Sequence, residues 1–337
     1  MISLKELAKA AGVSEATASL AINNRPGINA ATKEHILQLA DSLGYIPNRT
    51  AQSLARKSSG LIGMIIPNLI NTNYGQAVQL AEDWLRARGY RIIIATSKNN
   101  YRYEKEMIEQ FIAFRVEGVI IFPTVKENPD PTYVNLLTKH NIPFVFLGGR
   151  YREIDATCVM EDFYESTYRA TTYMYERGGR SFCLITGCKS IVSTSLRLNG
   201  MRDALRTHGQ DFSDDSHFAL ENTDYSCAYA LFDKLLKTGH NFDSVVTVNA
   251  SVGLAVYSAS VNHGLRVPED VSIVSSDITL ITIPMNTTRI NLTNILQNTV
   301  MIVETALDEL FYHIRGNQDN KIIHIKSDLI IGDSTRP

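Results

Sequence analysis

From Leu61 onward the sequence alternates between short apolar runs and longer amphipathic stretches, and this alternation restricts the possible folds more than any other feature. The runs have the length of strands and the stretches have the length of helices. Such an order builds parallel sheets covered by helices, and about ten strands over roughly 270 residues suit two doubly wound lobes better than one. We expect strands over Leu61–Ile66, Arg91–Ala95, Gly118–Phe122, Phe144–Leu147, Phe182–Thr186, Ser244–Val248 and Val271–Val274, and helices over Tyr74–Arg88, Glu104–Phe114, Pro131–His140, Tyr164–Glu176, Ser195–His208, Tyr225–Leu236 and Leu254–Asn262.

The first 45 residues predict three short helices ahead of this region. Ser3 and Glu6 have the spacing of a capping box, and Gly12 can end that helix in the left-handed conformation. Ser14 is expected to cap the second helix and Asn29 the third. Two short helices separated by three residues have the spacing of a helix-turn-helix. A generic three-helix bundle is the alternative interpretation.

Charge separates this N-terminal segment from the remainder of the chain. Residues 1–60 contain seven basic and four acidic side chains, whereas the whole chain has a net charge of −2. A basic head on an acidic body suits a phosphate-binding module attached to a body that need not touch nucleic acid. The sequence therefore favours DNA binding by the head.

Several classes of protein and site lack their signatures in this sequence. No apolar run approaches the roughly 18–20 residues that span a bilayer. The N-terminus carries Lys5, Glu6 and Lys9 and lacks the apolar core of a signal peptide, so we expect a cytoplasmic protein with no membrane partner. The four cysteines form no C-x-x-C pair and have no histidine cluster beside them, so neither a metal nor a cofactor is expected. The absence of nucleotide-binding and nucleophile-elbow motifs argues against an enzyme and against catalytic residues.

The residues of the head resemble the LacI/GalR family, and the resemblance extends over essentially the whole chain. The matching strings are Leu4 to Ser14, Ala16 to Ser19, Asn23, Leu43 to Asn48, Ile62 to Pro67, Glu117 to Ile121, Arg197 to Gly200, Val267 to Val271 and Leu329 to Thr335. The resemblance implies an all-α helix-turn-helix head at 1–47, a hinge helix and linker at 48–60, and an effector-binding and dimerisation domain at 61–337. That domain is expected to be an α/β sensor like the type I periplasmic binding proteins, with two lobes built on doubly wound parallel sheets. A homodimer on a pseudo-palindromic double-stranded operator is also implied.

By this resemblance residues 14–23 form the recognition helix. Glu15 and Ala16 match positions that read bases, whereas Leu20 replaces a common arginine and cannot make its bidentate contact with guanine. Leu54 matches the hinge-helix residue that wedges into the minor groove and kinks DNA. Residues 48–56 are too few for a stable isolated helix, which suits a switch; a frayed linker is the alternative. The other implied DNA-binding residues are Ser14, Thr17, Ser19, Asn23, Asn29, Tyr45, Asn48 and Ala51.

The resemblance also assigns residues to a small-molecule effector, near strand ends, where parallel sheets bind ligands. They are Asn73, Tyr74, Arg197, Asn249 and Asp277. The planar donor fork of Arg197 suits vicinal hydroxyls or a carboxylate. The chain departs from the family pattern at Gly148 and Ala250, where an acidic residue is frequent, and at Thr223, where an aromatic ring often stacks. The alternative for each retained polar residue is a structural group that closes a strand end.

Together these features predict a transcription regulator, in the first instance a repressor, whose operator affinity is controlled by a hydroxylated, sugar-like ligand. A transcriptional activator and a sensor of a non-sugar ligand such as a nucleoside are the open alternatives. An exported solute-binding protein would share the sensor fold but would leave residues 1–56 without a role.

Overall fold

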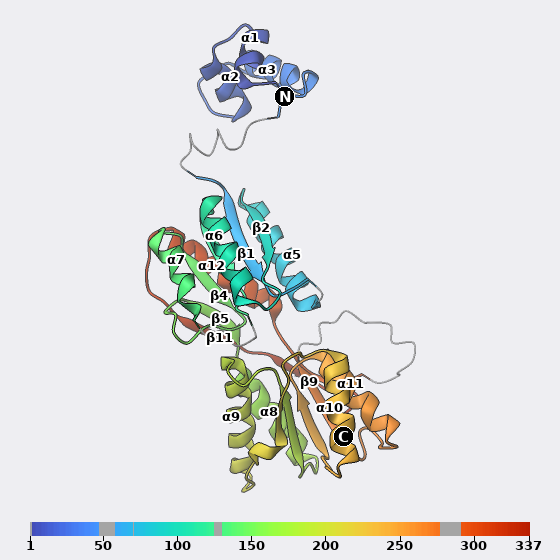
Figure 1. Ribbon diagram of the computed structural model, residues 1–337. Helices are drawn as coiled ribbons and strands as arrows, with labels where there is room; N and C mark the ends of the chain where they lie inside the picture. The colour runs from blue at the N-terminus through green and yellow to red at the C-terminus, as the bar shows by residue number, and fades with distance from the viewer. Residues whose placement is uncertain (1, 47–57, 70, 125–129, 277–290) are drawn as a thin grey trace. The chain divides into compact units, whose positions relative to one another are not determined.

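The computed structural model describes residues 2–46, 58–69, 71–124, 130–276 and 291–337 (Figure 1). The chain divides into two compact units, Met1–Gly60 and Leu61–Pro337. Each unit is described by itself.

Helices α1 (Leu4–Ala10), α2 (Glu15–Ile22) and α3 (Ala30–Ser42) make up the described part of the first unit. Each begins where a polar side chain accepts a backbone hydrogen bond, and the capping side chains are Ser3, Ser14 and Asn29. The predicted capping box is confirmed, since the Glu6 carboxylate also accepts from the Ser3 amide at 2.7 Å. The small core consists of Leu7, Ala21, Ile36 and Ala40.

The second unit contains two sheets, and the lobe built on the first sheet is here called the first lobe. In the described residues its strand order is β11-β5-β4-β3-β1-β2, and every adjacent pair is parallel. The strands are β1 (Leu61–Ile66), β2 (Arg91–Thr96), β3 (Gly118–Ile121), β4 (Phe144–Leu147), β5 (Cys158–Glu161) and β11 (Ile322–Ile325).

The second lobe has the strand order β12-β10-β9-β8-β6-β7 in the described residues. Its pairs are parallel except that the edge strand β12 runs antiparallel to β10. The strands are β6 (Phe182–Thr186), β7 (His217–Ala219), β8 (Ser244–Thr247), β9 (Ser272–Ser276), β10 (Thr293–Leu296) and β12 (Asp328–Ile330). The chain passes between the lobes after β5, after β10 and after β11.

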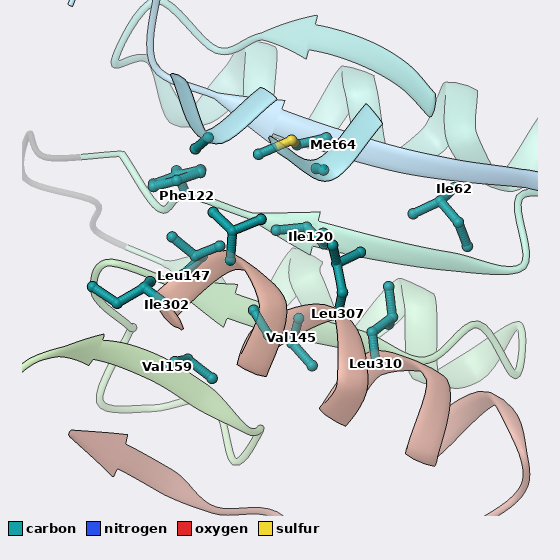
Figure 2. Close-up of a cluster of buried hydrophobic side chains, with 14 of the residues drawn as sticks. Ile62, Met64, Ile120, Phe122, Val145, Leu147, Val159, Ile302, Leu307 and Leu310 are labelled. Carbon is teal, nitrogen blue, oxygen red and sulfur yellow. The ribbon is translucent and has the colours of Figure 1, made fainter. Parts of the chain in front are cut away.

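Helices cover both faces of each sheet. In the first lobe α5 (Thr72–Ala87) and α12 (Thr299–Ile314) bury apolar side chains on one face, and α6 (Tyr101–Ala113) does so on the other. Figure 2 shows Leu307 and Leu310 of α12 beside strand residues such as Ile120 and Val145. In the second lobe, α8 (Phe163–Glu176) and α9 (Val192–Thr207) cover one face. The opposite face is covered by α10 (Tyr225–Lys237) and α11 (Ala250–Asn262).

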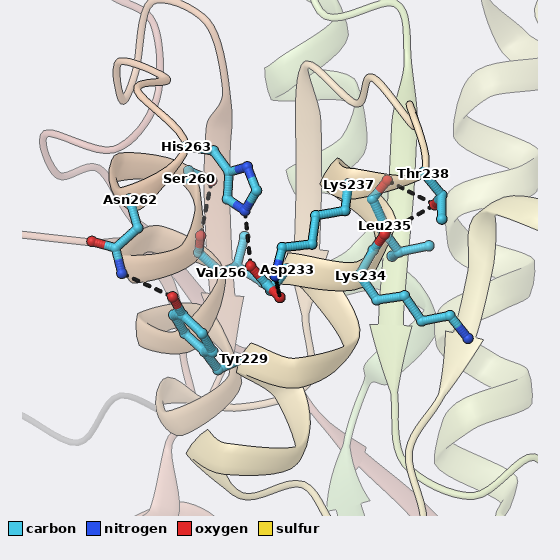
Figure 3. A network of polar contacts seen from close by, with 10 residues as sticks. All are labelled: Tyr229, Asp233, Lys234, Leu235, Lys237, Thr238, Val256, Ser260, Asn262 and His263. Carbon is cyan, nitrogen blue, oxygen red and sulfur yellow. Dashed lines mark hydrogen bonds and ion pairs between the residues drawn. The ribbon is translucent and has the colours of Figure 1, made fainter.

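Polar contacts tie α10 to α11 (Figure 3). The Asp233 carboxylate accepts from Lys237 at 2.8 Å and lies 2.8 Å from Nε2 of His263, which follows α11. The Asn262 amide donates to the Tyr229 hydroxyl at 2.8 Å. These contacts join the C-terminal end of α11 to α10, and the N-cap of α11 is Asn249, two residues beyond the end of β8.

Several expected helices have different boundaries in the structure: α9 begins at Val192 rather than Ser195, and α11 begins at Ala250 rather than Leu254. The helix expected to start at Glu104 begins three residues earlier, because Asn100 caps it by accepting from the Arg102 amide. The helix expected over Pro131–His140 is a 3₁₀ turn, Pro131–Val134, followed by α7 (Asn135–Lys139). The earlier start of α6 places Glu104 in its first turn, where it is fully buried.

Candidate DNA-reading helix and effector site

The candidate DNA-reading surface is the N-terminal part of α2. Ser14, Glu15 and Ala16 are exposed in succession, whereas Ala18 and Ala21 are buried in the helical bundle. The Ser14 hydroxyl lies 2.8 Å from the Thr17 hydroxyl and accepts from the Thr17 amide at 3.1 Å. This arrangement leaves the side chains of residues 15 and 16 outside the bundle.

The remaining head residues assigned to DNA have other internal contacts. The Asn23 amide group donates to the Ser19 carbonyl at 2.8 Å, and Asn29 caps α3 by accepting from Thr32 at 2.7 Å. Leu20 is half-buried, and a Cβ placed on Gly27 would lie 3.7 Å from its Cδ1. Tyr45 is half-buried, and burial raises its pKa. Asn48, Ala51 and Leu54 lie outside the described residues.

In the first lobe, Asn73 and Tyr74 lie in the first turn of α5, which follows the carboxyl end of β1. The Tyr74 ring packs edge-on against Phe122, with ring centroids 5.1 Å apart. The Asn73 Oδ1 atom is inaccessible to solvent and has no hydrogen-bond partner among the described residues. An unpaired buried oxygen is costly unless a ligand or water supplies a donor.

Arg197 and Asn249 belong to elements of the second lobe. The Arg197 side chain is 4% exposed, and its guanidinium lies 4.1 Å from the centroid of the Phe163 ring. Because that ring packs in a first-lobe core, Arg197 lies where the lobes meet. Asn249 accepts from the Val252 amide at 2.9 Å and donates to the Thr223 carbonyl at 3.0 Å, so it has the structural contacts of a helix cap. Asp277 lies outside the described residues.

Sequence reasoning missed further polar groups at the same strand ends. Four atoms, from Gln76, Ser97, Arg150 and Ser276, are inaccessible and lack a hydrogen-bond partner in the described part of the chain. Ser97 follows β2, Arg150 follows β4, and Ser276 ends β9. The available signal was the position of Arg150 in the sequence: it follows Gly148 and Gly149, which come directly after the apolar run Phe144–Leu147.

The first lobe contains a buried carboxyl group, that of Glu104, next to the loops that follow β3 and β4. Glu104 accepts from the hydroxyls of Tyr133 and Tyr151, both at 2.9 Å, and from the Thr124 amide at 3.0 Å. Burial raises the pKa of Glu104 to about 7, although the three hydrogen bonds act to lower it. Nothing local in the sequence indicates this network, because its members come from α6, the 3₁₀ turn and the loops after β3 and β4.

The described residues contain no cluster of three His, Cys, Asp or Glu side chains placed to hold a metal ion. Burial raises the pKa of the Cys158 thiol to about 12, so this cysteine is a poor nucleophile, and the nearby charge of Arg150 only partly opposes the shift. No helix in the described ranges is long and apolar enough to cross a membrane.

Two family models match the chain. Residues 3–48 match "Bacterial regulatory proteins, lacI family", and residues 59–287 match "Periplasmic binding proteins and sugar binding domain of LacI family". Catabolite control protein A of Staphylococcus epidermidis is 28% identical over 275 residues, covering 81% of this chain and 82% of that protein. The HTH-type transcriptional regulator AscG of Escherichia coli is 25% identical over 309 residues, covering 89% and 90%.

Solved structures share the fold. A Lac repressor dimer bound to operator and the anti-inducer ONPF has a TM-score of 0.88 at 24% identity, covering 100% of this chain and 99% of that one. A complex of the transcriptional regulator CelR with cellobiose has a TM-score of 0.73 at 22% identity, covering 99% and 100%. These similarities confirm the predicted fold: a helix-turn-helix head joined to a two-lobed, periplasmic-binding-protein-like sensor.

Proposed function

The chain belongs to the LacI family of bacterial regulatory proteins, and on that premise we propose that it is a transcriptional repressor controlled by a sugar-like ligand. The matched models describe DNA-binding regulators and ligand-binding proteins rather than enzymes. In this proposal a homodimer binds a pseudo-palindromic operator in the cytoplasm, and a small hydroxylated effector changes its operator affinity.

The exposed start of α2 carries the DNA-binding part of this proposal. Three consecutive side chains, Ser14 to Ala16, project outside a bundle that is otherwise packed by α1 and α3. A helix presented in this way can enter the major groove with its N-terminal side chains against base edges. We assign base contacts to Glu15 and Ala16, and backbone contacts to the polar residues that follow.

The effector part of the proposal is supported by the strand ends of the second unit. Several buried polar atoms that have no hydrogen-bond partner among the described residues, such as Asn73 Oδ1, lie near the strand ends where parallel sheets bind ligands. We therefore assign DNA reading to the head at 1–47, the hinge to residues 48–60, and effector binding and dimerisation to the domain at 61–337.

Operator selection tests the DNA-binding role directly. The full chain would select duplexes from a random library, and fluorescence anisotropy would compare the selected duplex with a scrambled one. We expect the selected duplex to bind at least about a thousandfold more tightly, as is usual for specific recognition. A pool that never converges, or equal affinity for both duplexes, would refute the proposed function.

A further inference from the structure

Two arginines near the contact between the lobes have no carboxylate partner among the described residues. Arg197 is 4% exposed and rests on the Phe163 ring, and no described residue forms a hydrogen bond or ion pair with it. Arg150, on the loop after β4, has an inaccessible Nε without a hydrogen-bond partner and forms no ion pair within the described residues. Arg197 is buried as a residue and the Nε atom of the half-buried Arg150 is inaccessible, so an acceptor on a ligand would supply a hydrogen bond that the described residues do not supply.

A contact between the lobes lies close in the sequence to each of these two arginines. The Arg152 guanidinium donates to the Ser195 hydroxyl at 3.3 Å, which joins the loop after β4 to the start of α9. Tyr151 and Leu196, the residues next to this contact, pack in the same core as Phe163. Each unpaired arginine is therefore two residues from a contact that links the lobes.

Two acidic side chains at the end of β5 already have partners on α8. Glu161, at the end of β5, accepts from the Ser166 hydroxyl at 2.8 Å. Asp162 caps α8 and accepts from the Glu165 amide at 3.0 Å. At position 148 the chain has glycine, so no carboxylate follows β4 directly.

We propose that the effector carries an anionic group, a phosphate or a carboxylate, which Arg150 and Arg197 bind beside the ligand's hydroxyls. The inference rests on the proposed function and specifies the ligand class of that same site. Both anions offer two or more oxygens to the planar guanidinium fork, and charge-assisted bonds of this kind are roughly twice as strong as neutral ones. The buried oxygens of Asn73 and Gln76 accept hydrogen bonds, so they suit the hydroxyl groups of the same ligand.

Thermal unfolding of the full chain with matched probes tests this inference. The probes are inorganic phosphate, gluconate and glucose, each at millimolar concentration and at equal ionic strength set with chloride. We expect phosphate or gluconate to raise the unfolding temperature and glucose to raise it less, and the more effective anion identifies the charged group. Arg197→Met and Arg150→Gln should each weaken binding of that anion by about one to two powers of ten.

Arg206→Gln is the matched control, because Arg206 lies on the same helix α9 with an exposed side chain paired to Asp203. It should keep the full response to the anion. A response equal in wild type and Arg197→Met, or one no larger for the anions than for glucose, would overturn the inference. Affinity for the selected operator, measured on the same preparations, separates the two claims: its absence refutes the proposed function, whereas its presence with no anion response refutes only the anionic effector.

Discussion

Glu104 shows how one buried side chain can make stability depend on pH. Its carboxyl group is fully buried, holds two tyrosine hydroxyls and one amide, and has a pKa raised by burial to about 7. Tyr151, one of its partners, stands between Arg150 and Arg152 on the loop that meets α9. Glu104 is therefore a positioning residue for that loop.

Glu104→Gln should change how stability varies with pH. The unfolded chain releases this proton near the ordinary pKa of 4.5 and the folded chain near 7, so the folded state binds more protons between these values. Raising the pH from about 5 to about 8 should destabilise wild type relative to the variant, by an amount on the order of 3 kcal/mol. Denaturant unfolding at a series of pH values measures this difference.

The control for that experiment is Glu106→Gln, which changes an exposed carboxylate on the same helix. Its stability should follow wild type over the whole pH range. If Glu104→Gln and wild type gave parallel curves, the carboxyl group would not be binding the extra proton.

Asn249 lies at a position where a structural and a ligand-binding role can be separated. Serine can replace its helix cap but cannot reach the Thr223 carbonyl or present an amide to a ligand, and alanine can do none of these. We expect the free energy of unfolding of Asn249→Ala to be about 1 kcal/mol lower than that of Asn249→Ser, which is the usual contribution of a helix cap. Both variants should lose the thermal response to the effector; a full response in Asn249→Ser would mean that Asn249 only caps α11.

At the scale of elements, local and distant interactions contribute differently. Helices α1, α2 and α3 begin where their sequence signals place them, because a cap joins residues three positions apart. The expected elements do not include α12, although Asn298 caps it by accepting from the Met301 amide, and its apolar face fills the core between α5 and the first sheet. A close approach of α8 and α9 depends on Gly200, where a Cβ would lie 2.3 Å from the Tyr164 carbonyl oxygen.

Leu54, in the part of the hinge that lies outside the described residues, gives a prediction that rests on the family resemblance. Leu54→Ala should weaken binding to the selected operator more than binding to scrambled DNA. A wedge contributes only where the duplex is kinked, whereas the charges of lysine and arginine act on any DNA. Anisotropy titrations with both duplexes measure the two losses, and equal losses would show that Leu54 only packs against protein.

At the scale of the whole molecule, the proposed division of labour requires two copies. One helix-turn-helix reads only a half-site, so a pseudo-palindromic operator needs a second head related by two-fold symmetry. The second unit, with its two lobes, is the part available to join the copies and to bind the effector.

The protein should be a homodimer, and its affinity for the operator should depend on the salt concentration. We expect a homodimer in analytical ultracentrifugation at micromolar concentration. Operator affinity should fall linearly on a log–log plot against salt, with a slope of about −0.9 for each phosphate neutralised. A monomer, or an affinity that does not change between low and moderate salt, would contradict this prediction.

The sequence by itself determined the fold class and the features that depend on neighbouring residues. The capping box at Ser3 and Glu6, the left-handed Gly12 with φ +68° and the apolar strand at Leu61–Ile66 were all predicted and are all present. Each follows from a period or a spacing of a few residues, over which the covalent chain fixes the distance between groups.

Only the tertiary structure decided which distant segments meet. Strand β11 pairs with β5 through Ile322 and Cys158, and Glu104 meets Tyr151 although no local pattern connects them. It also left Arg150 and Arg197 without carboxylate partners among the described residues. The physical reason is that pairing, burial and desolvation are properties of the assembled core, where sequence separation no longer sets the distance between two groups.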